Sequence, residues 1–518
     1  MKSTRKLIVL ALVMIISSFM GLSACSKKQA PEDTGNNASA SAAPEETSAP
    51  EPTPEPLEPY TIKMFVPGGA APKDQALVNE EVSKYLKDKL NVTLDMEVIE
   101  WGSWQDKINL KMASGEEFDL VSTFYWDNYL TKIQQGSIIP LNDLMDKYAK
   151  EAVSIMHPSL LNGGLVGGKT YGMPTNKEMA SAAGLLFRKD LVDKYQFDLS
   201  KVKTLQDLEP IYEVIKKNES GIYPLFVNKD LNLLSKIADN LYFTDLGDGK
   251  GAVLDRTTEE LKVIDKYQDP RTKEVMDLSH KWFKAGYINK DAATITDFQG
   301  PLKAGQVFSY VDLLKPGKDA EVSASLGQEW VQVIMTKPIV MTTDAQGVML
   351  SISRTSKNPE RVMQFLNLLY TDKTLINLID FGIEGKHYVK VSDNIIDFPA
   401  GIDASTSGYN PGAAWLMGNQ FNAYLWKNED PNKYENFKVF NDTSEASKSL
   451  GFSFTTDAVK NEIGAYVNVL PEFEYGLNVG ALDPNVYLPK LIDKLKTVGS
   501  DKILAEKQKQ LDAWVTSK

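Results

Sequence analysis

The chain has 518 residues, of which 57 are Lys or Arg and 69 are Asp or Glu, so its formal net charge is −12. This acidic surplus argues against nucleic acid or an anionic lipid surface as the main partner. The sequence holds one cysteine and three widely separated histidines, which excludes intrachain disulfides and cysteine-based metal sites. We therefore expect no metal and no cofactor.

The first 24 residues have the pattern of a secretory signal. Three positive charges precede an apolar run, residues 7–19, which is too short to span a bilayer. The run leads to the sole cysteine, and Leu22-Ser23-Ala24-Cys25 resembles the lipobox of bacterial lipoproteins, in which the cysteine is acylated and becomes the new N-terminus. We expect residues 1–24 to be a signal peptide and Cys25 to carry a lipid anchor in the membrane; the alternative is a plain signal peptide with a chance cysteine.

Residues 25–59 begin with the lipidated cysteine and continue as a segment rich in Pro, Ala and Glu. Residues 26–59 contain seven of the 25 prolines and no aromatic residue. Such a composition cannot bury enough apolar surface to offset the entropy lost on ordering. We expect a disordered linker.

From residue 60 onward, apolar periodicity predicts alternating strands and helices. Strands are expected at residues 61–66, 92–99 and 118–123, and helices at 74–90 and 104–112. This β-α-β-α-β order predicts a parallel α/β sheet. A second alternating block runs from residue 182 to about 310, followed later by helices at 359–370 and within 486–515.

Several phrases carry a family resemblance, and they occur in the same order as in that family. They are GLVGGKTYGMPTN (164–176), LLFRKDLVDKY (185–195) and SRTSKNPERVMQFLNLLY (353–370). Together they resemble the extracellular solute-binding proteins of ABC importers, of the carbohydrate-type family. Residues 381–426 resemble the C-terminal extension of a Gram-positive lipoprotein subgroup of that family.

The resemblance implies a two-lobed, periplasmic-binding-protein-like α/β fold of type II, in which a hinge lets the lobes close over a ligand. The first lobe is expected to comprise residues 60–173 with about 304–347, and the second 174–303 with about 348–375. Residues 376–518 are expected to form an extension packed on the second lobe and the cleft. The resemblance also implies an ABC permease as partner, a monomer, and a location on the extracellular face of a Gram-positive cell membrane.

Aromatic residues interleaved with polar ones give the strongest binding signal. The C–H faces of sugars lie flat on aromatic rings, while carboxylates and amides bind their hydroxyls. Such groups occur after two predicted strands, at the predicted hinge and in the extension. The expected ligand-binding residues are Trp101, Trp104, Trp126, Asp127, Tyr171, Asn176, Glu178, Glu384, Tyr388, Trp415, Asn419 and Gln420. For each aromatic residue the alternative is packing in the core.

Residues 163–170 match the P-loop pattern by letter. A P-loop requires a helix directly after it, and Pro174 closely follows the match, so we interpret the stretch as a glycine hairpin and reject nucleotide binding.

The main hypothesis is a non-enzymatic receptor that captures an oligosaccharide and delivers it to a permease. A secreted glycan-active enzyme is the first alternative. It requires two carboxyls about 5–10 Å apart, for which Glu100, Asp127 and Glu178 are candidates. A peptide or metal-chelate receptor on the same fold is the second alternative, and it predicts a charged cleft with few stacking rings.

Overall fold

The computed structural model describes residues 57–247 and 251–517. The expected signal peptide, Cys25 and nearly all of the expected linker lie outside these ranges. Within them, no helix combines the length and the apolar character that a membrane crossing requires.

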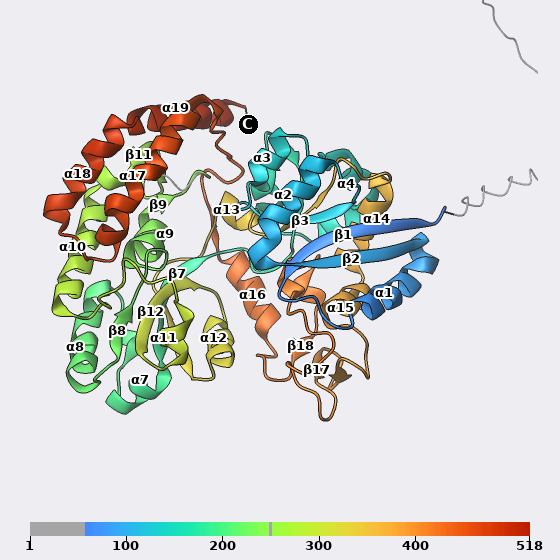
Figure 1. The fold of residues 1–518 in the computed structure, drawn as a ribbon, viewed down its shortest axis with the longest axis horizontal. Helices are drawn as coiled ribbons and strands as arrows, with labels where there is room; N and C mark the ends of the chain where they lie inside the picture. The colour runs from blue at the N-terminus through green and yellow to red at the C-terminus, as the bar shows by residue number, and fades with distance from the viewer. Residues whose placement is uncertain (1–56, 248–250, 518) are drawn as a thin grey trace, which may run out of the picture. The chain divides into compact units, whose positions relative to one another are not determined.

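The first sheet has the strand order β2-β1-β3-β15-β6 (Figure 1). Strands β1 (Tyr60–Gly68), β2 (Val92–Glu100) and β3 (Leu120–Thr123) run parallel, connected by α1 (Gln75–Leu90) and α2 (Trp104–Ser114). This confirms the predicted β-α-β-α-β order. Strands β15 (Met349–Ile352) and β6 (Met173–Pro174) add antiparallel pairings.

The first sheet is enclosed by helices whose apolar stripes form one core with it. In α14 (Pro359–Thr371), for example, Val362, Phe365, Leu366 and Leu369 are all buried in this core, as helical periodicity requires. The other helices around this core are α3 (Tyr129–Gln134), α4 (Asn142–Tyr148), α5 (Lys150–Ser154), α6 (Pro158–Gly163), α13 (Thr342–Ala345) and α15 (Lys373–Phe381).

The second sheet has the strand order β13-β7-β12-β8. Strand β7 (Ala182–Arg188) is antiparallel to both β12 (Val307–Leu314) and β13 (Trp330–Ile334), and β8 (Tyr223–Phe226) is parallel to β12. Its helices are α7 (Lys189–Tyr195), α8 (Glu209–Asn218), α9 (Asp239–Tyr242), α10 (Pro270–Ala285), α11 (Gln299–Lys303) and α12 (Lys318–Leu326).

The strand pairings correct the expected division of the chain into lobes. The sequence-based division places 304–347 in the first lobe, but β12 and β13 bond to β7 of the second sheet. It places 348–375 in the second lobe, but β15 bonds to β3 of the first sheet. Local periodicity identifies a strand but not the strand with which it pairs. It therefore does not show to which of the two sheets a later strand belongs.

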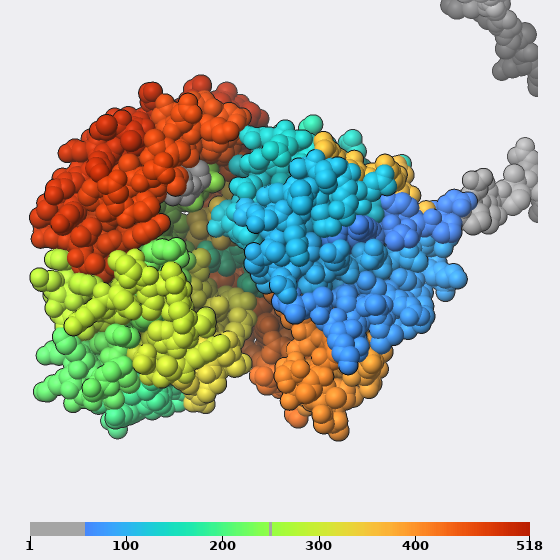
Figure 2. Space-filling model, viewed as in Figure 1, coloured from blue at the N-terminus to red at the C-terminus, as the bar shows by residue number. Residues whose placement is uncertain are grey.

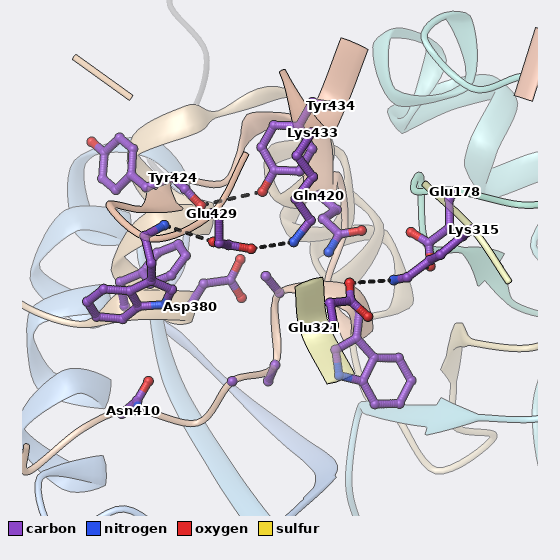
Figure 3. A pocket seen from close by; sticks show the side chains of 16 residues that line it. Glu178, Lys315, Glu321, Asp380, Asn410, Gln420, Tyr424, Glu429, Lys433 and Tyr434 are labelled. Atoms are coloured by element: carbon purple, nitrogen blue, oxygen red, sulfur yellow. Dashed lines mark hydrogen bonds and ion pairs between the residues drawn. The ribbon is translucent and has the colours of Figure 1, made fainter. Parts of the chain in front are cut away.

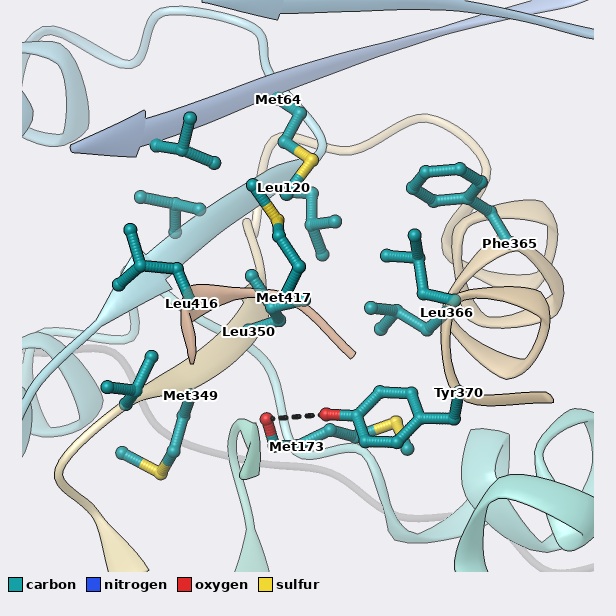
Figure 4. Packing of buried hydrophobic residues seen from close by; sticks show 14 of the residues in the cluster. Met64, Leu120, Met173, Met349, Leu350, Phe365, Leu366, Tyr370, Leu416 and Met417 are labelled. Atoms are coloured by element: carbon teal, nitrogen blue, oxygen red, sulfur yellow. Dashed lines mark hydrogen bonds between the residues drawn. The ribbon is translucent and has the colours of Figure 1, made fainter. Parts of the chain in front are cut away.

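The expected C-terminal extension divides between the two halves. Up to residue 450 it packs on the first core, and Figure 4 shows Leu416 and Met417 among side chains of the first sheet and of α14. This part contains α16 (Lys433–Asp442) and a small sheet of β16 (Val389–Lys390), β17 (Ile395–Asp397) and β18 (Leu425–Trp426). For this part the prediction that the extension packs on the second lobe is therefore wrong, because it packs on the first core.

The last three helices pack on the second half of the fold. They are α17 (Lys460–Asn478), α18 (Pro484–Thr497) and α19 (Ser500–Thr516). Helices α17 and α18 contact α10, while α19 contacts β10 (Ala252–Asp255) and β11 (Val263–Asp265), which form a small sheet with β9 (Phe243–Thr244) (Figure 1). Their apolar residues share one cluster with residues 234–276.

Candidate functional site

Three extended segments connect the two halves, and they lie side by side. Ser181 and Ile339 exchange backbone hydrogen bonds of 2.9 and 3.0 Å. Strand β14 (Ile339–Val340) then pairs in parallel with β19 (Glu445–Ala446). A bundle of extended crossings has the geometry of a hinge, because small backbone rotations in a few residues reorient whole sheets.

A cavity of about 390 Å³ lies beside these crossings, and we call it the hinge cavity. Glu178 lines it from the first crossing, and Lys315 and Glu321 line it from the end of β12 and from α12. The remaining wall consists of residues between 380 and 434. In Figure 2 the surface is hollowed between the yellow region that includes α12 and the orange region of this C-terminal segment.

Glu178 connects the first crossing to the second sheet. Its carboxylate lies 3.1 Å from the Lys177 ammonium and 3.2 Å from that of Lys315, which also contacts Glu321 at 3.0 Å. Burial alone would raise the pKa of Glu178, but the two ammoniums lower it to about 2. Glu178 is therefore an anion held by one lysine of its own crossing and one lysine of the second half.

Asp380 occupies the opposite wall, near the end of α15. Its side chain is buried, and neither carboxyl oxygen has a hydrogen-bond partner among the described residues. Burial raises its pKa well above the ordinary value. Figure 3 shows the Asp380 carboxyl directed toward the interior of the labelled side chains, where Glu429 and Lys433 form an ion pair. Asp380 is thus a polar group that faces the cavity and has no hydrogen-bond partner within residues 57–247 and 251–517.

Three exposed tryptophans form a cluster at one side of the hinge cavity. Trp415 lines the cavity and stacks on Trp101, with ring centroids 6.0 Å apart and an interplanar angle of 9°. Trp126 lies 6.4 Å from Trp101. These side chains are 40% (Trp101), 48% (Trp126) and 37% (Trp415) exposed. We call Trp101, Trp126 and Trp415 the tryptophan cluster; such exposure is unusual for residues whose large apolar area normally packs inside.

The sequence places two members of this cluster at adjacent strand ends. Trp101 directly follows β2, which ends at Glu100, and Trp126 follows β3, which ends at Thr123. The carboxyl ends of parallel strands meet at one edge of a sheet, where open α/β folds bind ligands. Trp415 joins them from the C-terminal segment.

Two other expected binding residues form a buried support instead. The Trp104 indole N–H donates to Asp127 at 3.0 Å, and Asp127 pairs with Lys132 at 3.0 Å. All three side chains are buried. For Trp104 the structure therefore shows the alternative, core packing, and the network fixes the loop that carries Trp126.

Asn176 and Asn419 position the cavity wall. Their side chains bond at 3.1 Å, and the Asn176 backbone bonds to Gly418 at 2.8 Å and to Gln420 at 3.0 Å. This pairing places Gln420 in the wall of the hinge cavity. The two asparagines themselves line a separate cavity of about 600 Å³.

The remaining expected residues do not line the hinge cavity. Tyr171 packs against the first core, Tyr388 is buried in a small aromatic cluster, and Glu384 pairs with Lys390 at 3.2 Å. Of the twelve expected binding residues, the hinge cavity is lined by Glu178, Trp415 and Gln420.

Sequence reasoning missed several residues of the cavity wall. Asp380 left a detectable signal, because it is the one acidic residue in α15, whose Leu375, Ile376 and Ile379 are buried. Lys315 and Lys433 could not be identified from the sequence, because a lysine near a helix or strand end usually faces solvent.

The stretch that matches the P-loop pattern forms a hairpin. Strands β4 (Leu165–Val166) and β5 (Lys169–Thr170) pair around Gly167 and Gly168, whose φ angles are 57° and 76°. Glycine adopts such positive φ angles without steric cost. No helix follows the hairpin before β6, which confirms the hairpin interpretation.

Comparison with known proteins identifies the family. Residues 69–375 match the bacterial extracellular solute-binding protein family, and residues 448–516 match a domain of unknown function (DUF3502). A carbohydrate ABC transporter substrate-binding protein of Streptococcus pneumoniae is 31% identical over 467 residues, covering 88% of this chain and 91% of the relative. The chain belongs to the bacterial extracellular solute-binding protein family. This confirms the resemblance noted in the sequence.

Solved structures support the same fold. The N-glycan transport solute binding protein of Streptococcus pneumoniae has a TM-score of 0.78 and 30% identity, covering 89% of this chain and 99% of that protein. Its complex with Man5GlcNAc has a TM-score of 0.69 at 30% identity, with the same coverage. The protein therefore has the two-lobed type II fold of solute-binding proteins, as expected.

Proposed function

We propose that the protein is the oligosaccharide-binding component of an ABC importer and that its ligand binds in the hinge cavity and on the tryptophan cluster. The stacked pair of Trp101 and Trp415 carries this proposal, because it continues an exposed indole surface into a cavity with carboxyl, amide and ammonium groups. Indole faces bind the C–H faces of sugars, and the polar groups bind their hydroxyls.

A fragment of an N-glycan is the ligand class that we propose. The similar Streptococcus pneumoniae protein is an N-glycan transport solute binding protein with a structure in complex with Man5GlcNAc. An oligosaccharide of several residues also suits a site that extends from the cavity onto three exposed rings. A peptide receptor is instead expected to have a charged cleft with few stacking rings, which does not match a stacked, exposed indole pair.

Closure of the two halves is the proposed signal to the permease. Glu178 lies on a hinge crossing, whereas Lys315 and Glu321 come from the second half and Trp415 from the first. A ligand that contacts both walls favours the closed form by its differential affinity for that form. The closed form then docks on the permease and releases the sugar.

We further propose that Cys25 is lipidated and that residues 25–59 tether the receptor to the outer face of a Gram-positive cell membrane, where it works as a monomer. The Leu-Ser-Ala-Cys motif and the proline-rich composition support this arrangement. Two acyl chains suffice for lasting attachment to a membrane.

The receptor performs no hydrolysis in this proposal. Glu178 carries two ammonium partners and a pKa of about 2, so it holds no proton to donate to a glycosidic oxygen at neutral pH. Asp127 is buried and paired with Lys132. These pairings disfavour acid and base roles for Glu178 and Asp127, two of the three carboxyls that the enzyme alternative names as candidates.

A thermal-shift screen with mass spectrometry tests the proposal. The purified protein is melted with Man5GlcNAc, with short peptides and with metal salts. A glycan at 100 times its Kd adds about 2.7 kcal/mol, which raises Tm by about 3 °C in a chain of this size. We expect a shift with the glycan, which is recovered intact. A response to peptides or metals alone, or cleavage of the glycan, contradicts the proposal.

A further inference from the structure

Among the described residues, three side chains supply the buried unpaired polar atoms of the hinge cavity. Both oxygens of Asp380, Oε1 of Gln420 and Oε2 of Glu178 are buried and have no hydrogen-bond partner among the described residues. All three residues are more than nine-tenths buried, and all three line the cavity. Buried polar groups without partners are costly, so they mark positions that a ligand satisfies.

We propose that Asp380, Gln420 and Glu178 form a polar subsite that binds an uncharged, hydroxyl-bearing sugar residue and excludes anionic sugars. This inference rests on the proposed function and names the ligand class within it. Hydroxyls both donate and accept, so a sugar residue with several hydroxyls can satisfy these unpaired atoms. A carboxylate or phosphate only accepts, and it leaves the oxygens of Gln420 and Glu178 unpaired.

The charges of the cavity favour the same ligand. Three carboxylates line it, Glu178, Glu321 and Glu429, against two lysines, Lys315 and Lys433, while the fourth acidic residue of the wall, Asp380, is uncharged in this proposal. Each of these lysines is already paired, Lys315 with Glu178 and Glu321, and Lys433 with Glu429. Among the described residues of the wall, an anionic sugar therefore meets carboxylates and no free cation, and drawing Lys315 or Lys433 toward the anion weakens an existing ion pair.

Asp380 has the surroundings of a group that remains uncharged. It is the penultimate residue of α15, where the free carbonyls of the helix end disfavour a negative charge. Burial raises its pKa well above the ordinary value. A neutral carboxyl offers one donor and one acceptor, which matches the two functions of a sugar hydroxyl.

Calorimetric titrations with matched glycans test the subsite. The probes are Man5GlcNAc, the same glycan with a 6-phosphate on each terminal mannose, and the same glycan with its reducing end oxidised to the aldonate. The two derivatives place a negative charge at either end of the ligand. We expect Man5GlcNAc to bind at least tenfold more tightly than one or both derivatives.

The variant Asp380→Leu separates a binding role from a structural one, because leucine has nearly the shape of aspartate and neither donates nor accepts a hydrogen bond. We expect its affinity for Man5GlcNAc to fall at least tenfold, while its Tm without glycan stays the same or rises, because the variant removes an unpaired buried carboxyl. Asp393→Leu is the matched control, since Asp393 is an exposed carboxylate in the same C-terminal segment. Its affinity is expected to equal that of the original protein.

Each outcome decides between the two proposals. If Man5GlcNAc binds and both anionic derivatives bind equally well, the exclusion of anionic sugars is wrong and the proposed function stands. An unchanged affinity of Asp380→Leu overturns the role of Asp380. A lower Tm with unchanged affinity gives Asp380 a structural role only. If no glycan binds the original protein, the proposed function fails and the subsite fails with it.

Discussion

Trp415 and Trp104 illustrate how one residue type serves two purposes in this protein. Trp415 is partly exposed beside the hinge cavity, whereas Trp104 is buried and donates to Asp127. We expect Trp415→Ala to weaken Man5GlcNAc binding by about 1.4 kcal/mol, or tenfold, because it removes a stacking face. Calorimetric titration measures this loss.

Trp104→Phe is the matched control for Trp415→Ala. It removes a buried hydrogen bond to a carboxylate and is expected to lower the free energy of unfolding by about 1.5–3 kcal/mol, with unchanged glycan affinity of the folded protein. Urea unfolding and titration measure the two quantities. If Trp415→Ala instead lowers the free energy of unfolding and Trp104→Phe weakens glycan binding, the assignment of Trp415 to the binding surface and of Trp104 to the buried support is wrong.

Glu178 predicts a specific acid dependence of stability. Its pKa in the folded protein is about 2, below the ordinary value near 4.5, so its ion pairs stabilise the fold above pH 4.5 and lose this effect as the pH falls toward 2. Glu178→Gln is therefore expected to lower the free energy of unfolding by about 3 kcal/mol at pH 7. The difference between variant and original protein should shrink as the pH falls below 4.5.

Urea unfolding at pH 7, 5, 4 and 3 measures this dependence. Glu384→Gln is the control, because its partner Lys390 is exposed and such surface pairs contribute about 0–1 kcal/mol. A loss for Glu178→Gln that is constant from pH 7 to pH 3 would show that the ion pairs of Glu178 are not its cause.

Some residues of the candidate site can be predicted from the sequence and others cannot, for a physical reason. Trp101 and Trp126 were predictable because they follow strands, and strand ends are local features. The spacing of Trp104 with Ile108 and Met112 already places it on the buried stripe of α2. Its hydrogen bond to Asp127, 23 residues away, is not encoded by periodicity. Asp380 faces Glu178 and Lys315 across the cavity only after distant segments have assembled.

Strand β7 shows how one glycine sets the packing of an element. A Cβ on Gly184 would lie 2.0 Å from the Val333 carbonyl oxygen, so strands β7 and β13 approach as they do because this residue lacks a side chain. We expect Gly184→Ala to lower the free energy of unfolding by about 1–3 kcal/mol through overpacking. Thermal or urea unfolding measures the change.

Gly464→Ala is the control with the opposite sign. Gly464 lies within α17, and a Cβ there meets nothing within 4 Å. Alanine costs less conformational entropy than glycine in a helix, so this variant is expected to gain about 0.5–1 kcal/mol. Equal effects of the two substitutions would contradict the close approach of β7 and β13.

The positions of strands and helices were easier to predict than the pairing between strands. The strands and helices of the first sheet follow from period-two and helical patterns in residues 60–123, and the structure confirms their order. The assignment of 304–347 and 348–375 to lobes is wrong because β12 and β15 each pair with strands more than 100 residues away. Pairing over such separations depends on the assembled core.

The whole molecule combines a hinged receptor with an expected tether. The family resemblance, rather than periodicity, supplied the two-lobed fold, and the comparisons confirm it. The lipid anchor stays a prediction. Cys25→Ala is expected to release the protein from the membrane into the medium, because one acylated residue supplies the anchor. Cell fractionation with immunoblotting measures the distribution.

Ser26→Ala is the control for that experiment, since it leaves the cysteine in place. A Cys25→Ala protein that remains in the membrane fraction would show that the apolar run at residues 7–19, or another contact, retains it instead.

A crystal structure of the protein grown with Man5GlcNAc tests the central claim most directly. We predict an intact, uncharged sugar residue in the hinge cavity, within hydrogen-bond distance of Asp380 and Gln420, and a sugar ring stacked on Trp415 or Trp101. A glycan bound elsewhere, or a hinge cavity that stays empty at saturating glycan, would contradict the account.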